Sequence, residues 1–84
     1  MDTYVMAFES THAAMASQRA LADMPGFALI PTPARISAGC GMSLMFAAAS
    51  DGAAIEAARS SRDACGLAAL YRRDGEAFCE VARL

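Results

Sequence analysis

Apolar residues along this chain fall into short blocks whose spacing switches between the period of a strand and that of a helix. Residues 3–8 are β-branched, aromatic and apolar, which predicts a first strand. Residues 11–24 are strong helix formers with apolar positions three and four apart, so they predict a first helix. Pro25 and Gly26 then end that helix, and residues 27–32 follow as a second strand.

The second half of the chain repeats this succession after a break. Residues 34–41 have neither period and predict a loop, whereas residues 42–47 alternate enough to be a third strand. Asp51 is a good amino-terminal cap for a second helix over residues 52–64. Residues 67–72 predict a fourth strand.

The order β-α-β-β-α-β predicts an α+β, ferredoxin-like fold: a four-stranded antiparallel sheet with two helices on one face. We expect a single domain over residues 1–84, with a core over about 3–72. Residues 74–84 predict a short helix or a tail, because Phe78, Val81 and Leu84 share one side of a helix.

Composition limits the classes of function. Of the residues, 56% are hydrophobic, but alanine supplies much of this, so the core is thin and a homo-oligomer is plausible. The net charge of −2 gives no reason to bind nucleic acid. No apolar run approaches the ~20 residues that span a bilayer, and the first residues lack the basic start of a signal peptide. We therefore expect a cytoplasmic protein without membrane contact.

Chemistry is concentrated on cysteine. Three cysteines in a chain with no secretory signal favour reduced thiols. A single histidine, His12, and the lack of a C-x-x-C spacing argue against a metal site. Cys40 lies in the loop between Gly39 and Gly41, which leave its sulfur sterically open and supply backbone amides that can hold an anion.

The predicted topology brings three segments to one end of the sheet: residues 10–12, 35–41 and 65–66. Cys40 would then face the amino end of the first helix, where free amides and the helix dipole stabilise a thiolate. Arg35 on the same loop would add a positive charge.

Most of these residues also have a plainer interpretation. Ser10 and Thr11 are helix caps first and substrate contacts second, and His12 is either a solvated first-turn residue or a proton donor or acceptor for Cys40. Cys65 is a packed thiol or a second thiol that pairs with Cys40. For Cys79 the sequence leaves open a buried spacer or an exposed thiol.

Two motifs resemble the selenium/sulfur carrier protein-like family of small bacterial proteins: FESTHAAM at residues 8–15 and IPTPARISAGCGMSL at residues 30–44. The resemblance covers about residues 4–71. The family's serine-threonine-histidine helix start matches residues 10–12. Its threonine-proline segment and the serine and Cys-Gly pair that follow match Thr32, Pro33, Ser37, Cys40 and Gly41.

The resemblance implies a carrier rather than a turnover enzyme. Cys40 would hold selenium or sulfur as a perselenide or persulfide, taken from a donor protein and delivered to an acceptor enzyme. No cofactor is implied, because the chalcogen is covalent cargo. The alternative is a non-catalytic ferredoxin-like interaction or regulatory module, in which Cys40 is structural or senses redox state.

Overall fold

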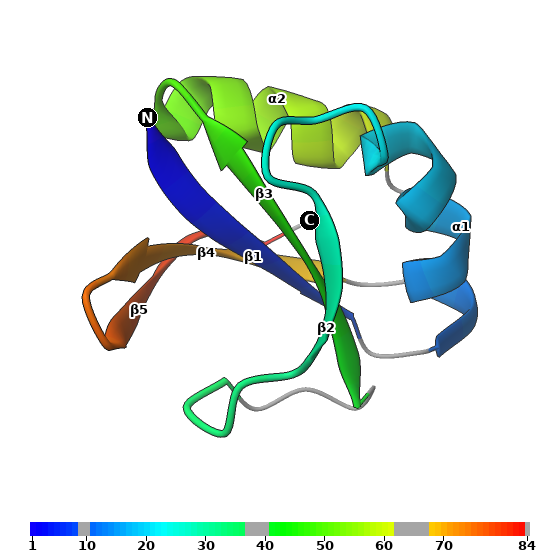
Figure 1. Ribbon diagram of the computed structural model, residues 1–84, viewed down its shortest axis with the longest axis horizontal. Coiled ribbons are helices and arrows are strands. Elements are labelled where there is room, and N and C mark those ends of the chain that lie inside the picture. Colours follow the sequence, from blue (N-terminus) through cyan, green and yellow to red (C-terminus); the bar gives the residue numbers. More distant parts are fainter. Residues whose placement is uncertain (9–10, 37–40, 62–67, 84) are drawn as a thin grey trace.

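A five-stranded antiparallel sheet is packed against two helices in the computed structural model, which describes residues 1–8, 11–36, 41–61 and 68–83 (Figure 1). The elements in chain order are β1 (Asp2–Phe8), α1 (Thr11–Leu21), β2 (Ala28–Pro31), β3 (Met42–Ala48), α2 (Asp51–Ser61), β4 (Ala68–Asp74) and β5 (Ala77–Arg83). The α+β class is therefore confirmed.

The strands lie in the order β2-β3-β1-β4-β5, and every neighbouring pair is antiparallel. The first four of these have the order that a β-α-β-β-α-β sheet requires, with β1 and β3 in the centre. The prediction of four strands was wrong, because β5 adds a fifth at the free edge of β4. The ferredoxin-like expectation is thus matched in part.

Strand β5 replaces the short helix or tail expected over residues 74–84. A tight turn makes the hairpin: Asp74 pairs with Ala77, and Gly75 has a φ of +62° at the first central position, as a II′ turn requires. A register shift at Leu70 and Tyr71 then leaves Val81 as an extra residue on β5. The bulge explains why two consecutive β5 residues, Val81 and Ala82, pack against the same core.

The main core lies between the sheet and the helices. Alternate residues of the central strands are fully buried there, and small residues of α1 and α2 close over them. The largest of these buried side chains are Tyr4, Met6, Phe8, Leu44, Phe46, Leu21 and Leu70. The Tyr4 and Phe46 rings stack with centroids 6.0 Å apart. Both helices thus cover one face of the sheet, as predicted.

The opposite face of the sheet has a smaller core. Val5 and Ala7 of β1 are buried there beneath Ile36, which comes from the segment between β2 and β3. Half-buried side chains surround these three, among them Met45 and Tyr71. Both faces of β1 are therefore covered, by helices on one side and by the chain's own loop on the other.

Capping of α2 differs from the expectation in one residue. Ser50, rather than Asp51, is the cap: its Oγ accepts a hydrogen bond from the Ala53 amide at 3.1 Å, and its carbonyl accepts one from the Ala54 amide. The Asp51 carboxylate is turned instead toward the start of β1, where it has other partners. The sequence alone does not show which of the adjacent residues Ser50 and Asp51 caps α2, because serine and aspartate are both favoured at that position.

Ser17 of α1 has a buried hydroxyl whose effect on stability can be measured. Its hydroxyl is fully buried on α1 and has no hydrogen-bond partner among the described residues. Because an unpaired buried hydroxyl is costly, Ser17→Ala should raise the free energy of unfolding by about 1 kcal/mol in urea titrations. Ser61→Ala is the matched control, since the Ser61 hydroxyl donates to the Ala58 carbonyl at 2.9 Å. A stability loss in Ser17→Ala as large as that in Ser61→Ala would contradict the prediction.

Candidate functional site

Three segments of the chain leave the sheet at one end. The β1 register pairs Ala7 with Ser43 of β3 and Phe8 with Ala68 of β4. The chain therefore enters α1 from the same sheet end at which β3 and β4 begin. These three strand ends flank the segments that contain residues 10–12, 35–41 and 65–66.

The segment between β2 and β3 is closed at its base by hydrogen bonds. The Thr32 amide donates to the Gly41 carbonyl at 2.9 Å, and the Thr32 and Ser43 hydroxyls share a hydrogen bond of 2.8 Å. Within the segment, the Ile36 amide donates to the Pro33 carbonyl and so forms a tight turn. Because Ile36 is also buried on the sheet, both described neighbours of residues 37–40, Ile36 and Gly41, are fixed by contacts with the rest of the fold.

The predicted site residues are only partly described by the structure. Thr11 is the first residue of α1, and His12 follows it with an exposed side chain. The first turn of α1 has no acidic residue, so nothing in that turn opposes an anion near its free amides. Ser10, Gly39, Cys40 and Cys65 lie outside the described residues, and their predicted convergence stays a prediction.

Arg35 and Gly41 lie on either side of residues 36–40 and are both exposed. Among the residues that the structure describes, none other than its chain neighbour has an atom within 4 Å of a Cβ placed on Gly41. No described side chain therefore crowds the chain at the start of β3. Arg35 precedes Ile36, and the Ile36 side chain is packed on the sheet face without helices.

A polar cluster that the sequence did not predict lies at the other end of the sheet. The buried Tyr4 hydroxyl donates to Asp51 Oδ1, and Arg72 Nη1 donates to Asp51 Oδ2, each at 2.6 Å. Burial, followed by the hydrogen bond to the Asp51 carboxylate, raises the pKa of Tyr4 to about 12. The same two hydrogen bonds, from Tyr4 and then Arg72, lower the pKa of Asp51. This cluster ties α2 to β1 and β4, and we assign it to structure.

Cys79 is an exposed free cysteine on β5. Its register partner is Arg72 of β4, so it lies near the Tyr4–Asp51–Arg72 cluster and away from the sheet end where Phe8 and Ala68 pair. The structure therefore answers the question that the sequence left open. Cys79 is an exposed thiol on β5.

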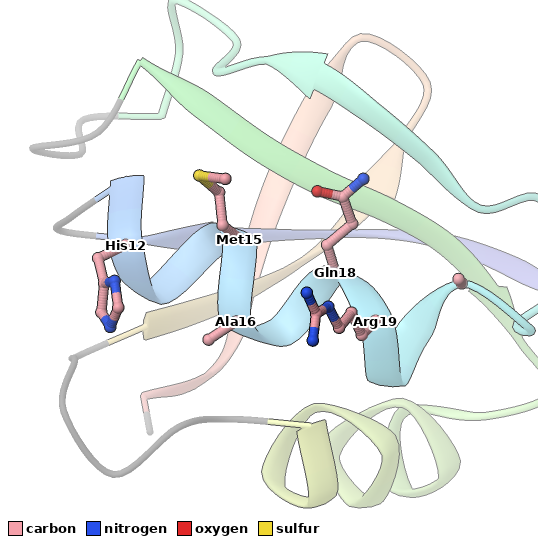
Figure 2. Close-up of a pocket in the computed structure, with 6 residues that line it drawn as sticks. His12, Met15, Ala16, Gln18 and Arg19 are labelled. Carbon is pink, nitrogen blue, oxygen red and sulfur yellow. The ribbon is translucent and has the colours of Figure 1, made fainter.

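A surface hollow of about 700 Å³ runs along α1 (Figure 2). It is lined by His12, Met15, Ala16, Gln18, Arg19 and Ala22. Met15 is 64% exposed, a large value for an apolar side chain on a helix that packs against a core. Because His12 lies at one end of this hollow, the hollow extends to the first turn of α1 and so to the sheet end described above.

No helix within residues 1–8, 11–36, 41–61 and 68–83 has the length and apolar character needed to cross a membrane. In the same ranges, no three His, Cys, Asp or Glu side chains gather closely enough to hold a metal ion.

Comparison with known proteins gave one result that bears on this site. Residues 3–61, which are 59 of the 84 residues, match the model of the family described as "Putative Se/S carrier protein-like". The matched stretch runs from β1 through α2 and includes all the residues predicted to form the site except Cys65. Neither the search of curated proteins nor that of solved structures gave a significant match.

Proposed function

The chain belongs to the putative Se/S carrier protein-like family, and we propose that it carries selenium or sulfur on Cys40 and delivers it to an acceptor enzyme. The cargo is a perselenide or persulfide. The protein acts as a carrier, so it needs a reactive thiol and a way of meeting its partners, and it needs no cofactor.

The chemistry of loading is an exchange at a chalcogen–chalcogen bond. The Cys40 thiolate attacks the outer sulfur of a donor persulfide, a new sulfur–sulfur bond forms on Cys40, and the donor thiolate leaves. Delivery repeats the exchange, with Cys40 as the leaving thiolate. Each step conserves electrons, and each is favoured by surroundings that stabilise an anion on Cys40.

The observation that carries the proposal is the shared sheet end of β1, β3 and β4. Phe8 leads toward α1, while Gly41, the neighbour of Cys40, leads into β3 beside it. A thiolate in this region would lie close to the free amides at the start of an 11-residue helix whose first turn has no carboxylate. None of the described residues other than its chain neighbour lies within 4 Å of a Cβ placed on Gly41, which supports room for one additional chalcogen atom.

Mass spectrometry after incubation with a persulfide donor tests the proposal. The wild-type protein should gain the mass of one sulfur atom, or one selenium atom from a perselenide donor, and peptide mapping should place it on Cys40. Cys40→Ser should lose nearly all of this uptake, because a hydroxyl is not ionised near neutral pH. Cys65→Ser and Cys79→Ser are matched controls that should load like the wild-type protein. Equal uptake by Cys40→Ser and wild type would refute the proposal.

A second candidate function comes from the sheet face without helices. Met45, Tyr71 and Phe78 are half-buried there around Val5 and Ala7, which leaves apolar area open for a partner. In that interaction or regulatory module Cys40 would be structural or redox-sensing. The same experiment separates the two functions, since such a module would gain no chalcogen on Cys40.

A further inference from the structure

The outer side of α1 has the properties of a docking surface that the core does not need. His12, Met15 and Arg19 come from successive turns of the helix and are all exposed (Figure 2). Ala13, Ala14 and Leu21 already supply the apolar contacts of α1 with the sheet. Met15 therefore places apolar area in solvent without contributing to the core.

The hollow along α1 carries one formal charge, that of Arg19, while the exposed Asp23 in the turn after the helix does not line it. Arg19 is the basic residue of the last turn of α1, and of the six residues that line the hollow none is acidic. The chain as a whole has a net charge of −2, so this side of α1 differs from the average surface. An apolar side chain beside a guanidinium, in a hollow lined by no carboxylate, favours a partner that presents apolar groups and a carboxylate.

A second copy of the chain fits this surface poorly. If two α1 helices packed antiparallel across a twofold axis near Met15, Arg19 of one copy would lie opposite His12 of the other. Neither helix supplies a carboxylate to neutralise the guanidinium, because α1 contains no Asp or Glu. The charge pattern thus favours a different, acidic partner over self-association.

Position and size narrow the choice of partner. The surface begins at His12, in the first turn of α1, next to the sheet end where Gly41 leads into β3. A protein seated on α1 would therefore border the Cys40 segment. An 11-residue helix is only ~16 Å long, so the contact is small and suits a partner that binds briefly and leaves.

From these observations we propose that the outer side of α1 is where the chalcogen donor enzyme docks, with an apolar side chain against Met15 and a carboxylate against Arg19. This inference rests on the proposed carrier function and adds the partner's surface to it. The guanidinium orients the encounter so that the donor's persulfide approaches the end of the sheet that precedes β3.

The test compares two sources of sulfur: a purified cysteine desulfurase with a persulfide on its own cysteine, and glutathione persulfide. For each variant, the rate constant of transfer from the desulfurase is divided by that from glutathione persulfide. This ratio should fall about tenfold in Arg19→Glu and in Met15→Asp, through a higher KM for the desulfurase at unchanged kcat. It should stay at the wild-type value in Arg59→Glu, which makes the same charge change in the last turn of α2.

The outcomes separate this inference from the function on which it rests. Failure of glutathione persulfide to load Cys40 in the wild-type protein contradicts the carrier function itself. Two results would overturn the docking surface alone, provided that glutathione persulfide loads Cys40 normally. One is an equal ratio for Arg19→Glu and Arg59→Glu, and the other is a transfer rate that does not saturate with increasing desulfurase. Sedimentation provides one further check: a wild-type dimer that Met15→Asp converts to a monomer would mean that this surface joins two copies of the chain.

Discussion

In a Tyr4→Phe variant, the free energy of unfolding should stay nearly constant between pH 10 and pH 12, whereas that of the wild-type protein should fall by about 2 kcal/mol. The difference comes from one buried hydroxyl. Tyr4 is fully buried, and its hydroxyl donates to the Asp51 carboxylate at 2.6 Å. Ionising it would place a negative charge in the core against another negative charge.

The loss of stability with rising pH follows from the difference between the pKa of Tyr4 in the folded protein and in the unfolded chain. Burial and the bond to Asp51 raise the pKa of Tyr4 from 10.0 to about 12 in the folded protein. The native state therefore holds a proton that the unfolded chain releases over this range. The stabilisation is fully present below pH 10 and is lost as the pH rises toward 12. A shift of two units allows up to about 2.7 kcal/mol, and we expect less because Asp51 is 42% exposed.

The composition makes this measurement clean. The chain has no lysine, so tyrosine is its only residue type with a reference pKa near 10. Urea titrations followed by circular dichroism between pH 8 and pH 11.5 should show the two curves converge and then cross. Tyr4→Phe should be about 1 kcal/mol less stable at pH 8 for want of its hydrogen bond, and the more stable of the two at the alkaline end. Tyr71→Phe, the matched control, should keep the alkaline loss. Parallel curves for Tyr4→Phe and wild type would contradict the raised pKa.

The type and spacing of apolar residues, together with caps and turn residues, were sufficient to predict the first four strands and both helices. The expected strand at residues 42–47 is Met42–Ala48 in the structure, and the expected helix at residues 11–24 ends at Leu21. The helix is shorter because the Met24 amide donates to the Leu21 carbonyl in a tight turn, ahead of Pro25. The end of a helix before a proline depends on neighbouring residues, so it can be predicted from the sequence.

The fifth strand was missed because its residues satisfy two periods at once. Phe78, Val81 and Leu84 have helical spacing, yet the structure has a strand here with a bulge at Val81. Phe78 packs on the face without helices and Val81 on the face that the helices cover, so their spacing of three fits a strand with apolar residues on both faces as well as a helix. Gly75 was the signal for a hairpin, since glycine at the first central position is what a two-residue II′ turn requires.

Contacts between distant residues explain what else was missed. The bond between Tyr4 and Asp51 joins residues 47 apart, and the one between Thr32 and Ser43 closes a segment from positions 11 apart. Neither leaves a local pattern in the sequence. By contrast, the approach of the three strand ends follows from the strand order alone, and it could be anticipated before any side chain was placed.

Ile36 gives the second large effect, because it ties the Cys40 segment to the sheet. Its side chain is 4% exposed and packs in the small core of Val5 and Ala7 on the face without helices. Truncation would leave a cavity there that neighbouring side chains fill only in part. Ile36→Ala should therefore lower the free energy of unfolding by about 2–3 kcal/mol in urea titrations.

The same variant should also change the reactivity of Cys40. In a protein with Cys65→Ser and Cys79→Ser, Cys40 is the sole thiol, and its alkylation by iodoacetamide at pH 7 follows the fraction present as thiolate. If residues 37–40 are held between Ile36 and the Thr32–Gly41 hydrogen bond, releasing one end should move the thiol away from the groups that stabilise its charge. We expect the alkylation rate constant to fall about threefold or more.

Two further variants separate this local effect from a general loss of stability. Ile55→Ala removes a half-buried isoleucine from α2 on the helix side of the sheet, so it should destabilise the protein and leave alkylation unchanged. Ile36→Val keeps most of the contact and should lie between Ile36→Ala and the parent in both measurements. All rates are compared in buffer without denaturant, at a temperature where every variant is folded. If Ile55→Ala slows alkylation as much as Ile36→Ala does, Ile36 acts on Cys40 only through global stability, and the anchored segment is not what sets the reactivity of the thiol.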